Sequence, residues 1–138
     1  MPSSSILSTA ARIQGFLGDA LADSGITLSQ YSVLRILREA GAQGLPTLEI
    51  GRRMAERSPG VTRLIDRLER QGWAARRRDG TDRRQVTCML TEAGAELLSS
   101  LEERMADREA AIFASLTRHE QAALAHMLAR VDRALSEK

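Results

Sequence analysis

Five arginines crowd one short stretch of this sequence, at Arg76, Arg77, Arg78, Arg83 and Arg84, on either side of an Asp-Gly pair. A guanidinium group is always charged and presents a planar fork of donors that fits phosphate oxygens and guanine edges. Arginines packed this closely repel one another unless an anion lies nearby. The residues therefore predict the binding of a polyanion.

The charge of the whole chain supports this prediction because it is unevenly distributed. Residues 51–84 hold eleven arginines and five acidic residues, a net charge of +6, whereas the remainder holds nine basic and thirteen acidic residues, a net charge of −4. A basic centre between acidic flanks is typical of a nucleic-acid-binding protein. The alternative is an arginine-rich solvated surface, since 19 of the 20 basic residues throughout the chain are Arg. The concentration of the arginines on one motif favours nucleic acid.

A helix is predicted directly before the arginine-rich stretch. Ser58 is a suitable N-cap, Pro59 suits the first helical position, and Gly72 suits the residue that ends the helix. One face of the helix is apolar, with Val61, Leu64, Ile65 and Leu68 at helical spacing. The opposite face carries small residues near its start and arginines behind them, namely Gly60, Thr62, Arg63, Asp66, Arg67 and Arg70. This face can approach a DNA groove closely and contact phosphates.

The elements around this helix complete a recognisable architecture. Strands are predicted at 73–78 and 85–90, joined by the loop 79–84. Helices are predicted at 6–22, 29–40 and 47–55 before the motif, and at 92–115 and 118–136 after it. Thr27 with Gln30, and Thr117 with Glu120, have the spacing of capping boxes. The fold class expected is mainly α with a small β-hairpin wing, a winged helix-turn-helix between N- and C-terminal helices.

The terminal helices carry more apolar surface than a small winged module needs. A symmetric dimer with interleaved terminal helices would bury it, and a monomer whose terminal helices pack on their own module is the alternative. The organisation expected is an N-terminal dimerisation helix in 1–26, the DNA-binding module in 27–90 and C-terminal dimerisation helices in 91–138.

Two motifs in this sequence resemble those of the MarR family, the multiple antibiotic resistance regulators. Residues 82–94 fit the pattern D-x-R-x-x-x-x-x-L-T-x-x-G, and they follow the helix sequence VTRLIDRLERQG at 61–72. The resemblance implies an obligate homodimer that binds a palindromic site in double-stranded DNA. It further implies that most such proteins repress transcription, and that many release DNA when a small, often phenolic anion binds.

The resemblance also implies roles for individual residues. Arg84 matches the wing arginine that enters or lies beside the minor groove, and Asp82 matches the acid that holds it. The residues expected to contact the major groove are Ser58, Pro59, Gly60, Thr62 and Arg63, with Arg67 on a phosphate. The wing arginines Arg76, Arg77, Arg78 and Arg83 complete the expected DNA-binding set.

An effector site is expected where the first two helices flank a pocket. Arg12, Phe16, Tyr31 and Arg35 are its candidate residues, because an arginine and a tyrosine together can hold a carboxylate or phenolate. The alternative places Tyr31 in the core and both arginines on the surface.

Other chemistry finds little support in the sequence. There is no phosphate-binding glycine loop, nucleophile elbow or metal-ligand cluster, so neither an enzyme nor a cofactor nor a metal is expected. Cys88 is interpreted as an inert buried thiol rather than a redox switch, and His119 and His126 as surface or interface residues. No apolar run could span a membrane and no secretory signal is present at the N-terminus, so a cytoplasmic location is expected. Competing interpretations are an activator, a regulator without an effector, and a winged helix that binds another protein.

Overall fold

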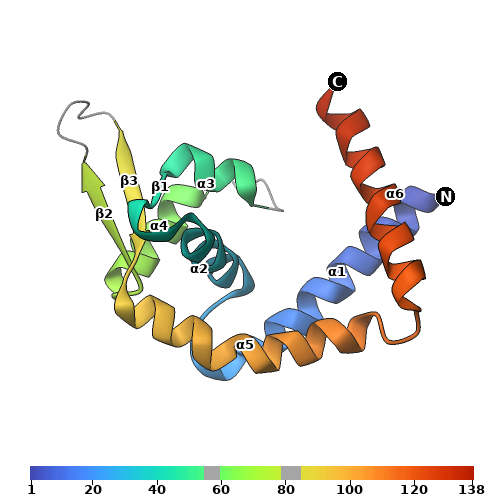
Figure 1. Ribbon diagram of the computed structural model, residues 1–138, viewed down its shortest axis with the longest axis horizontal. Helices are drawn as coiled ribbons and strands as arrows, with labels where there is room; N and C mark the ends of the chain where they lie inside the picture. Colours follow the sequence, from blue (N-terminus) through green and yellow to red (C-terminus); the bar gives the residue numbers. More distant parts are fainter. Residues whose placement is uncertain (55–59, 79–84) are drawn as a thin grey trace.

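The computed structural model describes residues 1–54, 60–78 and 85–138. Its helices are α1 (Pro2–Leu21), α2 (Leu28–Ala40), α3 (Thr47–Arg53), α4 (Val61–Arg70), α5 (Glu92–Ile112) and α6 (Arg118–Ser136). Its strands are β1 (Leu45–Pro46), β2 (Ala74–Arg78) and β3 (Val86–Leu90), and 3₁₀ turns follow α1 and α2. The expected mainly helical winged helix-turn-helix is confirmed (Figure 1).

Helix α2 lies at the centre of the hydrophobic core. Val33, Leu34 and Leu37 on its inner face are fully buried, and they pack in one cluster with residues of α3, α4, β3 and α5. The helix begins at the predicted capping box, since Thr27 Oγ1 accepts from the Gln30 N–H at 3.2 Å while Gln30 Oε1 accepts from the Thr27 N–H at 2.9 Å. A helix held at its start and buried along one face gives the winged module a rigid base.

The sheet has three antiparallel strands in the order β1-β3-β2. Strands β2 and β3 form the predicted hairpin, with Ala74 opposite Leu90 and Arg78 opposite Val86. Strand β1 was not predicted, because a strand of two residues shows no alternation, yet Leu45 and Pro46 pair with Cys88 and Thr87. Strand β3 is therefore central, and β2 is an edge strand that pairs with β3 on one side only.

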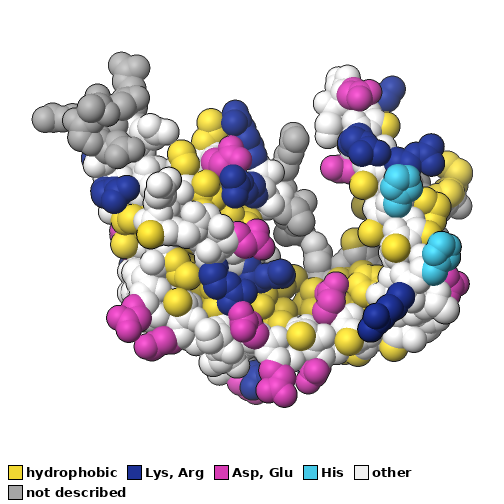
Figure 2. All heavy atoms as spheres, in the orientation of Figure 1, with side chains coloured by type: hydrophobic (Ala, Val, Ile, Leu, Met, Phe, Trp, Pro, Cys, Tyr) yellow, Lys and Arg dark blue, Asp and Glu magenta, His cyan; other side chains and the backbone are white. Residues whose placement is uncertain are grey.

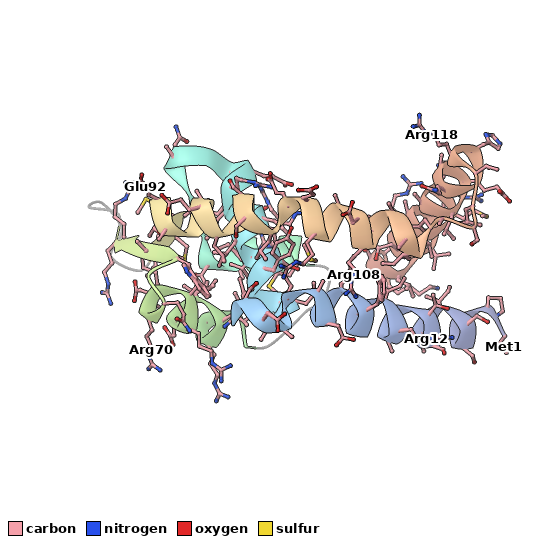
Figure 3. All side chains as sticks on the ribbon, turned by 90° about the horizontal axis from the view of Figure 1, so that it is seen from below. Met1, Arg12, Arg70, Glu92, Arg108 and Arg118 are labelled. Atoms are coloured by element: carbon pink, nitrogen blue, oxygen red, sulfur yellow. The ribbon has the colours of Figure 1, made fainter. Side chains whose placement is uncertain are left out.

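The terminal helices extend away from this module. Helix α5 runs from the base of the wing along α1, as Figures 1 and 3 show. Helix α6 leaves the far end of α5 at a steep angle, and it crosses the N-terminal half of α1 in Figure 1 but lies apart from it in Figure 3. Two arginines of α5 fasten it to α1, since Arg104 donates to the carbonyl of Ala20 at 3.1 Å and Arg108 to that of Phe16 at 3.0 Å. The Arg108 guanidinium also lies 4.5 Å from the centre of the Phe16 ring.

Several predicted boundaries were wrong. Helix α1 begins at Pro2 rather than at residue 6, α3 ends at Arg53 rather than at 55, and α5 ends at Ile112 rather than at 115. Helix α4 begins at Val61 with Gly60 as its N-cap, and the expected cap and first residue, Ser58 and Pro59, lie outside the described residues. Proline fits the first turn of a helix, which explains why α1 starts at Pro2.

Candidate nucleic-acid interface

Helix α4 is held with one face buried and the other in solvent. Ile65 and Leu68 are buried against α2 and the sheet, while Val61 and Leu64 pack partly against the same core. The side chains on the opposite face that are exposed are Thr62, Arg63, Arg67 and Arg70. The core contact of α4 thus leaves a hydroxyl and three guanidinium groups available to a ligand outside the protein.

The end of α4 fixes the direction in which the wing leaves it. Gly72 has a left-handed backbone, with φ of 80°, and its N–H donates to Glu69 O at 3.0 Å, while Trp73 N–H donates to Leu68 O at 2.9 Å. These two bonds form a Schellman motif, which satisfies carbonyls at the helix end. Strand β2 starts at Ala74, directly after Trp73, so the turn at Gly72 sets the path from α4 into the hairpin.

The same corner is tied to the start of α5. The Thr91 hydroxyl donates to Gly72 O at 2.6 Å, and it caps α5 by accepting from the Gly94 N–H at 3.1 Å. The backbone N–H of Thr91 donates to Trp73 O at 3.2 Å. A Cβ on Gly94 would overlap the carbonyl oxygen of Trp73. The L-T-x-x-G motif at 90–94 is therefore the point at which the base of the wing is fastened to α5.

The described arginines of β2 are not equivalent. Arg77 and Arg78 are exposed, whereas Arg76 is engaged by two acidic residues of α4. Its Nη2 lies 2.5 Å from Asp66 Oδ1 and 3.1 Å from Glu69 Oε1, and its backbone N–H donates to Glu69 Oε2 at 3.2 Å. The hydrogen bond from Arg76 lowers the pKa of Glu69, and the same bond raises the pKa of Arg76. The sequence analysis grouped Arg76 with the expected DNA-binding arginines and did not predict this ion pair.

Other expected interface residues lie outside the described part of the chain. They are Ser58 and Pro59 before α4, and Asp82, Arg83 and Arg84 in the hairpin loop. Gly60 is the N-cap of α4, and Thr62, Arg63 and Arg67 lie on the helix itself. The structure thus places four of the expected DNA-binding residues on one helix and its cap.

Cys88 lies in the middle of the sheet, fully buried. Burial raises the pKa of its thiol, and its Sγ lies 3.7 Å from the hydroxyl of Thr47 at the start of α3. A buried thiol with a raised pKa is a weak nucleophile at neutral pH.

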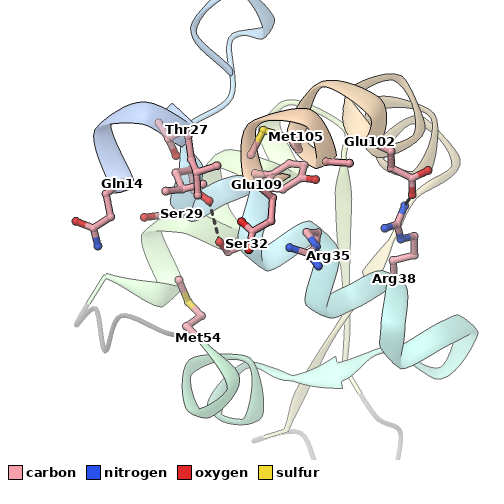
Figure 4. A pocket seen from close by; sticks show the side chains of 14 residues that line it. Gln14, Thr27, Ser29, Ser32, Arg35, Arg38, Met54, Glu102, Met105 and Glu109 are labelled. Atoms are coloured by element: carbon pink, nitrogen blue, oxygen red, sulfur yellow. Dashed lines mark hydrogen bonds and ion pairs between the residues drawn. The ribbon is translucent and has the colours of Figure 1, made fainter. Parts of the chain in front are cut away.

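A second site is a cavity of about 780 Å³ between α1, α2 and α5. Its polar lining includes Tyr31, Arg35 and Arg38 from α2, and Glu102 and Glu109 from α5 (Figure 4). Arg38 and Glu102 form an ion pair at one end, and Gln14 of α1 lies at the other. The cavity therefore offers guanidinium groups that can bind an anion and carboxylates that can bind a cation.

Only two of the four expected effector residues reach this cavity. Tyr31 is buried in the core but lines it, and Arg35 lies with its guanidinium carbon 5.9 Å from the Tyr31 ring centre. Arg12 and Phe16 are not among its lining residues, and Phe16 is instead covered by Arg108. The sequence missed Arg38, Glu102 and Glu109, because nothing in the local pattern shows that α5 faces α2.

Known proteins similar to this chain identify its family. The family model described as MarR family matches residues 26–86. The repressor MdtR of Bacillus subtilis is 32% identical over 126 residues, which cover 89% of this chain and 78% of MdtR. The regulator YkoM of the same organism is 36% identical over 99 residues, but these cover 72% of this chain and only 63% of YkoM. The chain belongs to the MarR family.

Solved structures of MarR proteins bound to DNA share its fold. The Streptomyces coelicolor regulator Sco3205 in complex with DNA has a TM-score of 0.88 at 26% identity, covering 96% of this chain and 84% of its own. A mutant MarR of E. coli complexed with operator DNA has a TM-score of 0.84 at 26% identity, covering 94% of this chain and 91% of its own. Wild-type E. coli MarR in its apo form has a TM-score of 0.74, covering 94% of each chain. This MarR-family chain is thus a DNA-binding transcriptional regulator, and family members are not enzymes.

The described residues form neither a metal-ligand cluster nor a membrane-spanning helix. Within residues 1–54, 60–78 and 85–138, no three His, Cys, Asp or Glu side chains are grouped as metal ligands. Among the helices of the same ranges, none combines the length and hydropathy of a membrane span.

Proposed function

We propose that this regulator works as a homodimer built from residues 1–26 and 91–138. The observation that supports the dimer is α6, a helix of 19 residues with none buried against the described chain. Its apolar side chains face solvent, with Met127 at 53%, Val131 at 50% and Leu135 at 67% exposure. Figure 2 shows hydrophobic side chains along α6 beside the two histidines.

A second copy of the chain is the occupant that this surface fits. Helix α1 continues the apolar surface with Ile6, Leu7 and Phe16, all of which are exposed. An isolated helix without tertiary contacts is marginal in water, and burying one such side chain contributes about 1.5–3 kcal/mol. A two-fold axis between the copies would cover both helices of both chains.

The dimer would present two copies of α4 and two wings to one face of DNA. We propose that Gly60, Thr62 and Arg63 contact bases in the major groove, together with Ser58 and Pro59. Arg67, Arg77, Arg78 and Arg83 would contact phosphates, and Arg84, oriented by Asp82, would occupy the minor groove. A narrow minor groove has enhanced negative potential, which suits a guanidinium group.

A comparison with two E. coli structures supports a conformation that can bind DNA. The chain is nearer in shape to the mutant MarR with operator DNA, at a TM-score of 0.84, than to the wild-type MarR in its apo form, at 0.74. Two α4 helices across a two-fold axis should meet half-sites about 34–36 Å apart, one turn of DNA. Repression is proposed because MdtR, similar over most of its length, is a repressor. Such a regulator would act in the cytoplasm, where it meets its DNA.

We propose that the cavity between α1, α2 and α5 binds a small aromatic carboxylate or phenolate that releases the DNA. Arg35 is the candidate anion partner, since Arg38 is already paired with Glu102. Because the cavity lies between the winged module and α5, a ligand there would change how α4 is held relative to the second copy. Arg12 and Phe16 would then act from outside the cavity, through the contact of α1 with α5.

The experiment that tests this function selects bound duplexes from random DNA with the purified full chain. The expected result is a palindrome with half-sites one helical turn apart. Binding to that duplex should weaken steeply with salt, by about 0.9 in logarithmic slope for each phosphate contact. Binding that depends little on salt, with no enriched sequence, would refute the proposal in favour of a protein-interaction module. Arg84→Ala should weaken binding and Asp82→Ala should also weaken it, although it removes a negative charge.

The effector is tested with benzoate as a simple aromatic carboxylate. If Arg35 holds the carboxylate, benzoate should raise the Kd of the wild type for the selected duplex, and Arg35→Gln should abolish that response. An unchanged Kd across a panel of aromatic carboxylates and phenols would favour a regulator without this kind of effector.

A further inference from the structure

The ion-pair cluster of Arg76, Asp66 and Glu69 joins the two parts of the protein that the proposed function brings to DNA. Arg76 belongs to β2, and the two acids lie one helical turn apart on α4. The planar guanidinium group reaches both carboxylates through Nη2, at 2.5 Å and 3.1 Å. The cluster therefore spans the corner at Gly72, which is the only covalent path from α4 to the wing.

The backbone of the wing takes part in the same contact. Strand β2 is at the edge of the sheet, so alternate N–H groups on its outer side have no partner strand. Glu69 accepts from the Arg76 N–H at 3.2 Å as well as from its side chain. One carboxylate thus holds both the main chain of β2 and the guanidinium group, which sets the angle of the strand as well as its distance from α4.

The charge of the cluster argues against a phosphate contact by Arg76. Two carboxylates and one guanidinium group leave a net charge of −1 beside the DNA-binding face. The side chain of Arg76 is 29% exposed, whereas Arg77 and Arg78, the next residues on the strand, are classed as exposed. A phosphate that approached Arg76 would have to compete with two acids already in contact.

We propose that Arg76, Asp66 and Glu69 are positioning residues that set the orientation of the wing relative to α4, and that Arg76 does not contact DNA. The inference rests on the proposed function, in which α4 and the wing bind the same site. Binding by two rigidly linked elements is tighter than binding by two loosely joined ones, because less motion is lost on association. The cluster acts on affinity by holding the wing at the angle that lets both elements reach their grooves.

Salt dependence separates positioning from direct contact. The probe is the palindromic duplex that the wild-type protein enriches from random DNA, and the measured quantities are Kd and the slope of log Kd against log salt concentration. Arg76→Gln is expected to weaken binding roughly tenfold with the slope unchanged. If Arg76 contacted a phosphate in each subunit, the slope would instead fall by about 1.8, two contacts at about 0.9 each. Arg77→Gln, one residue along, is the matched control and is expected to reduce the slope.

Glu69→Gln supplies a test of opposite sign. The change removes a negative charge near DNA, so simple electrostatics predicts tighter binding, whereas positioning predicts weaker binding. The double variant Glu69→Gln with Arg76→Gln should bind no more weakly than Arg76→Gln alone, because residues of one cluster are not additive. Tighter binding by Glu69→Gln would overturn the proposal even if Arg76→Gln did not fold. Additive losses in the double variant would overturn it when all three variants fold. Failure of the wild type to enrich any duplex would overturn the proposed function instead.

Discussion

Replacing Gly94 by alanine would place a methyl group against the backbone at the base of the wing. Gly94 lies in the first turn of α5, where alanine is intrinsically favoured over glycine by up to about 1 kcal/mol. A Cβ there would nevertheless overlap the carbonyl oxygen of Trp73, lie 3.1 Å from its carbonyl carbon and lie 2.7 Å from Leu90 Cδ1. Two of these atoms belong to the main chain, so a rotamer change cannot relieve the overlap.

The expected loss of stability follows from these contacts. Overpacking of this kind costs about 1–3 kcal/mol. Moving the Trp73 carbonyl also weakens the hydrogen bond from Thr91 N–H, a loss of about 1 kcal/mol. Setting these against the gain in helix propensity leaves a net destabilisation of about 1–3 kcal/mol. At roughly 3–5 °C for each kcal/mol in a chain of this size, the thermal midpoint should fall by several degrees.

The measurement is thermal or urea unfolding at one fixed protein concentration, since a dimer's apparent stability depends on concentration. Gly15→Ala is the matched control, because no described atom beyond its own neighbours and the adjacent backbone of α1 lies within 4 Å of its Cβ position. Gly15 also lies about 180° around α1 from the exposed Ile6. The control should be as stable as the wild type or slightly more so. A Gly94→Ala protein that matched or exceeded the wild type would refute the argument that close approach to Trp73 demands glycine.

Three further outcomes are expected. Cys88 should react slowly with a disulfide reagent in the native protein and quickly in urea, because the thiol is buried and burial raises its pKa. Rapid reaction of the native protein, or loss of DNA binding after peroxide treatment, would contradict an inert thiol. Thr117→Ala should cost about 1 kcal/mol of stability by removing the N-cap of α6, and an unchanged urea midpoint would show that the dimer does not depend on this cap. The pKa of Glu69 is lowered by its hydrogen bond with Arg76, so the stability that Glu69 adds should be complete above its usual unfolded pKa of about 4.3 and should be lost as the pH falls through the lowered pKa. The difference in stability between wild type and Glu69→Gln should accordingly be flat from neutral to mildly acidic pH and shrink in strong acid.

The helices were predictable because their signals are local. Periodic apolar residues placed the described helices to within a few residues at each end. Both capping boxes formed as predicted, since the groups involved lie three residues apart. Gly72 ends α4 with a left-handed backbone for the same reason. Strand β1 could not be predicted, because its two residues become a strand only by pairing with β3.

The site was predictable in composition but not in arrangement. The arginine content of residues 51–84 and the wing motif were sufficient to indicate DNA binding, which the family then confirmed. The same composition did not distinguish Arg76, which forms ion pairs, from its neighbours on the strand. Its ion pairs depend on the angle between α4 and β2, and that angle is set by the turn at Gly72 and by the fastening of Thr91.

By itself, the sequence determined the class of fold, the approximate positions of the helices and the polyanionic nature of the partner, because each depends on residue type and short spacing. Only the tertiary structure showed which of the described arginines form ion pairs, Arg76 among them. It also decided that Arg38 meets Glu102, 64 residues away, and that Arg108 covers Phe16, 92 residues away. Such contacts arise when helices that are individually predictable pack at particular angles, and those angles are set by the combined shape of many side chains rather than by any local run of residues.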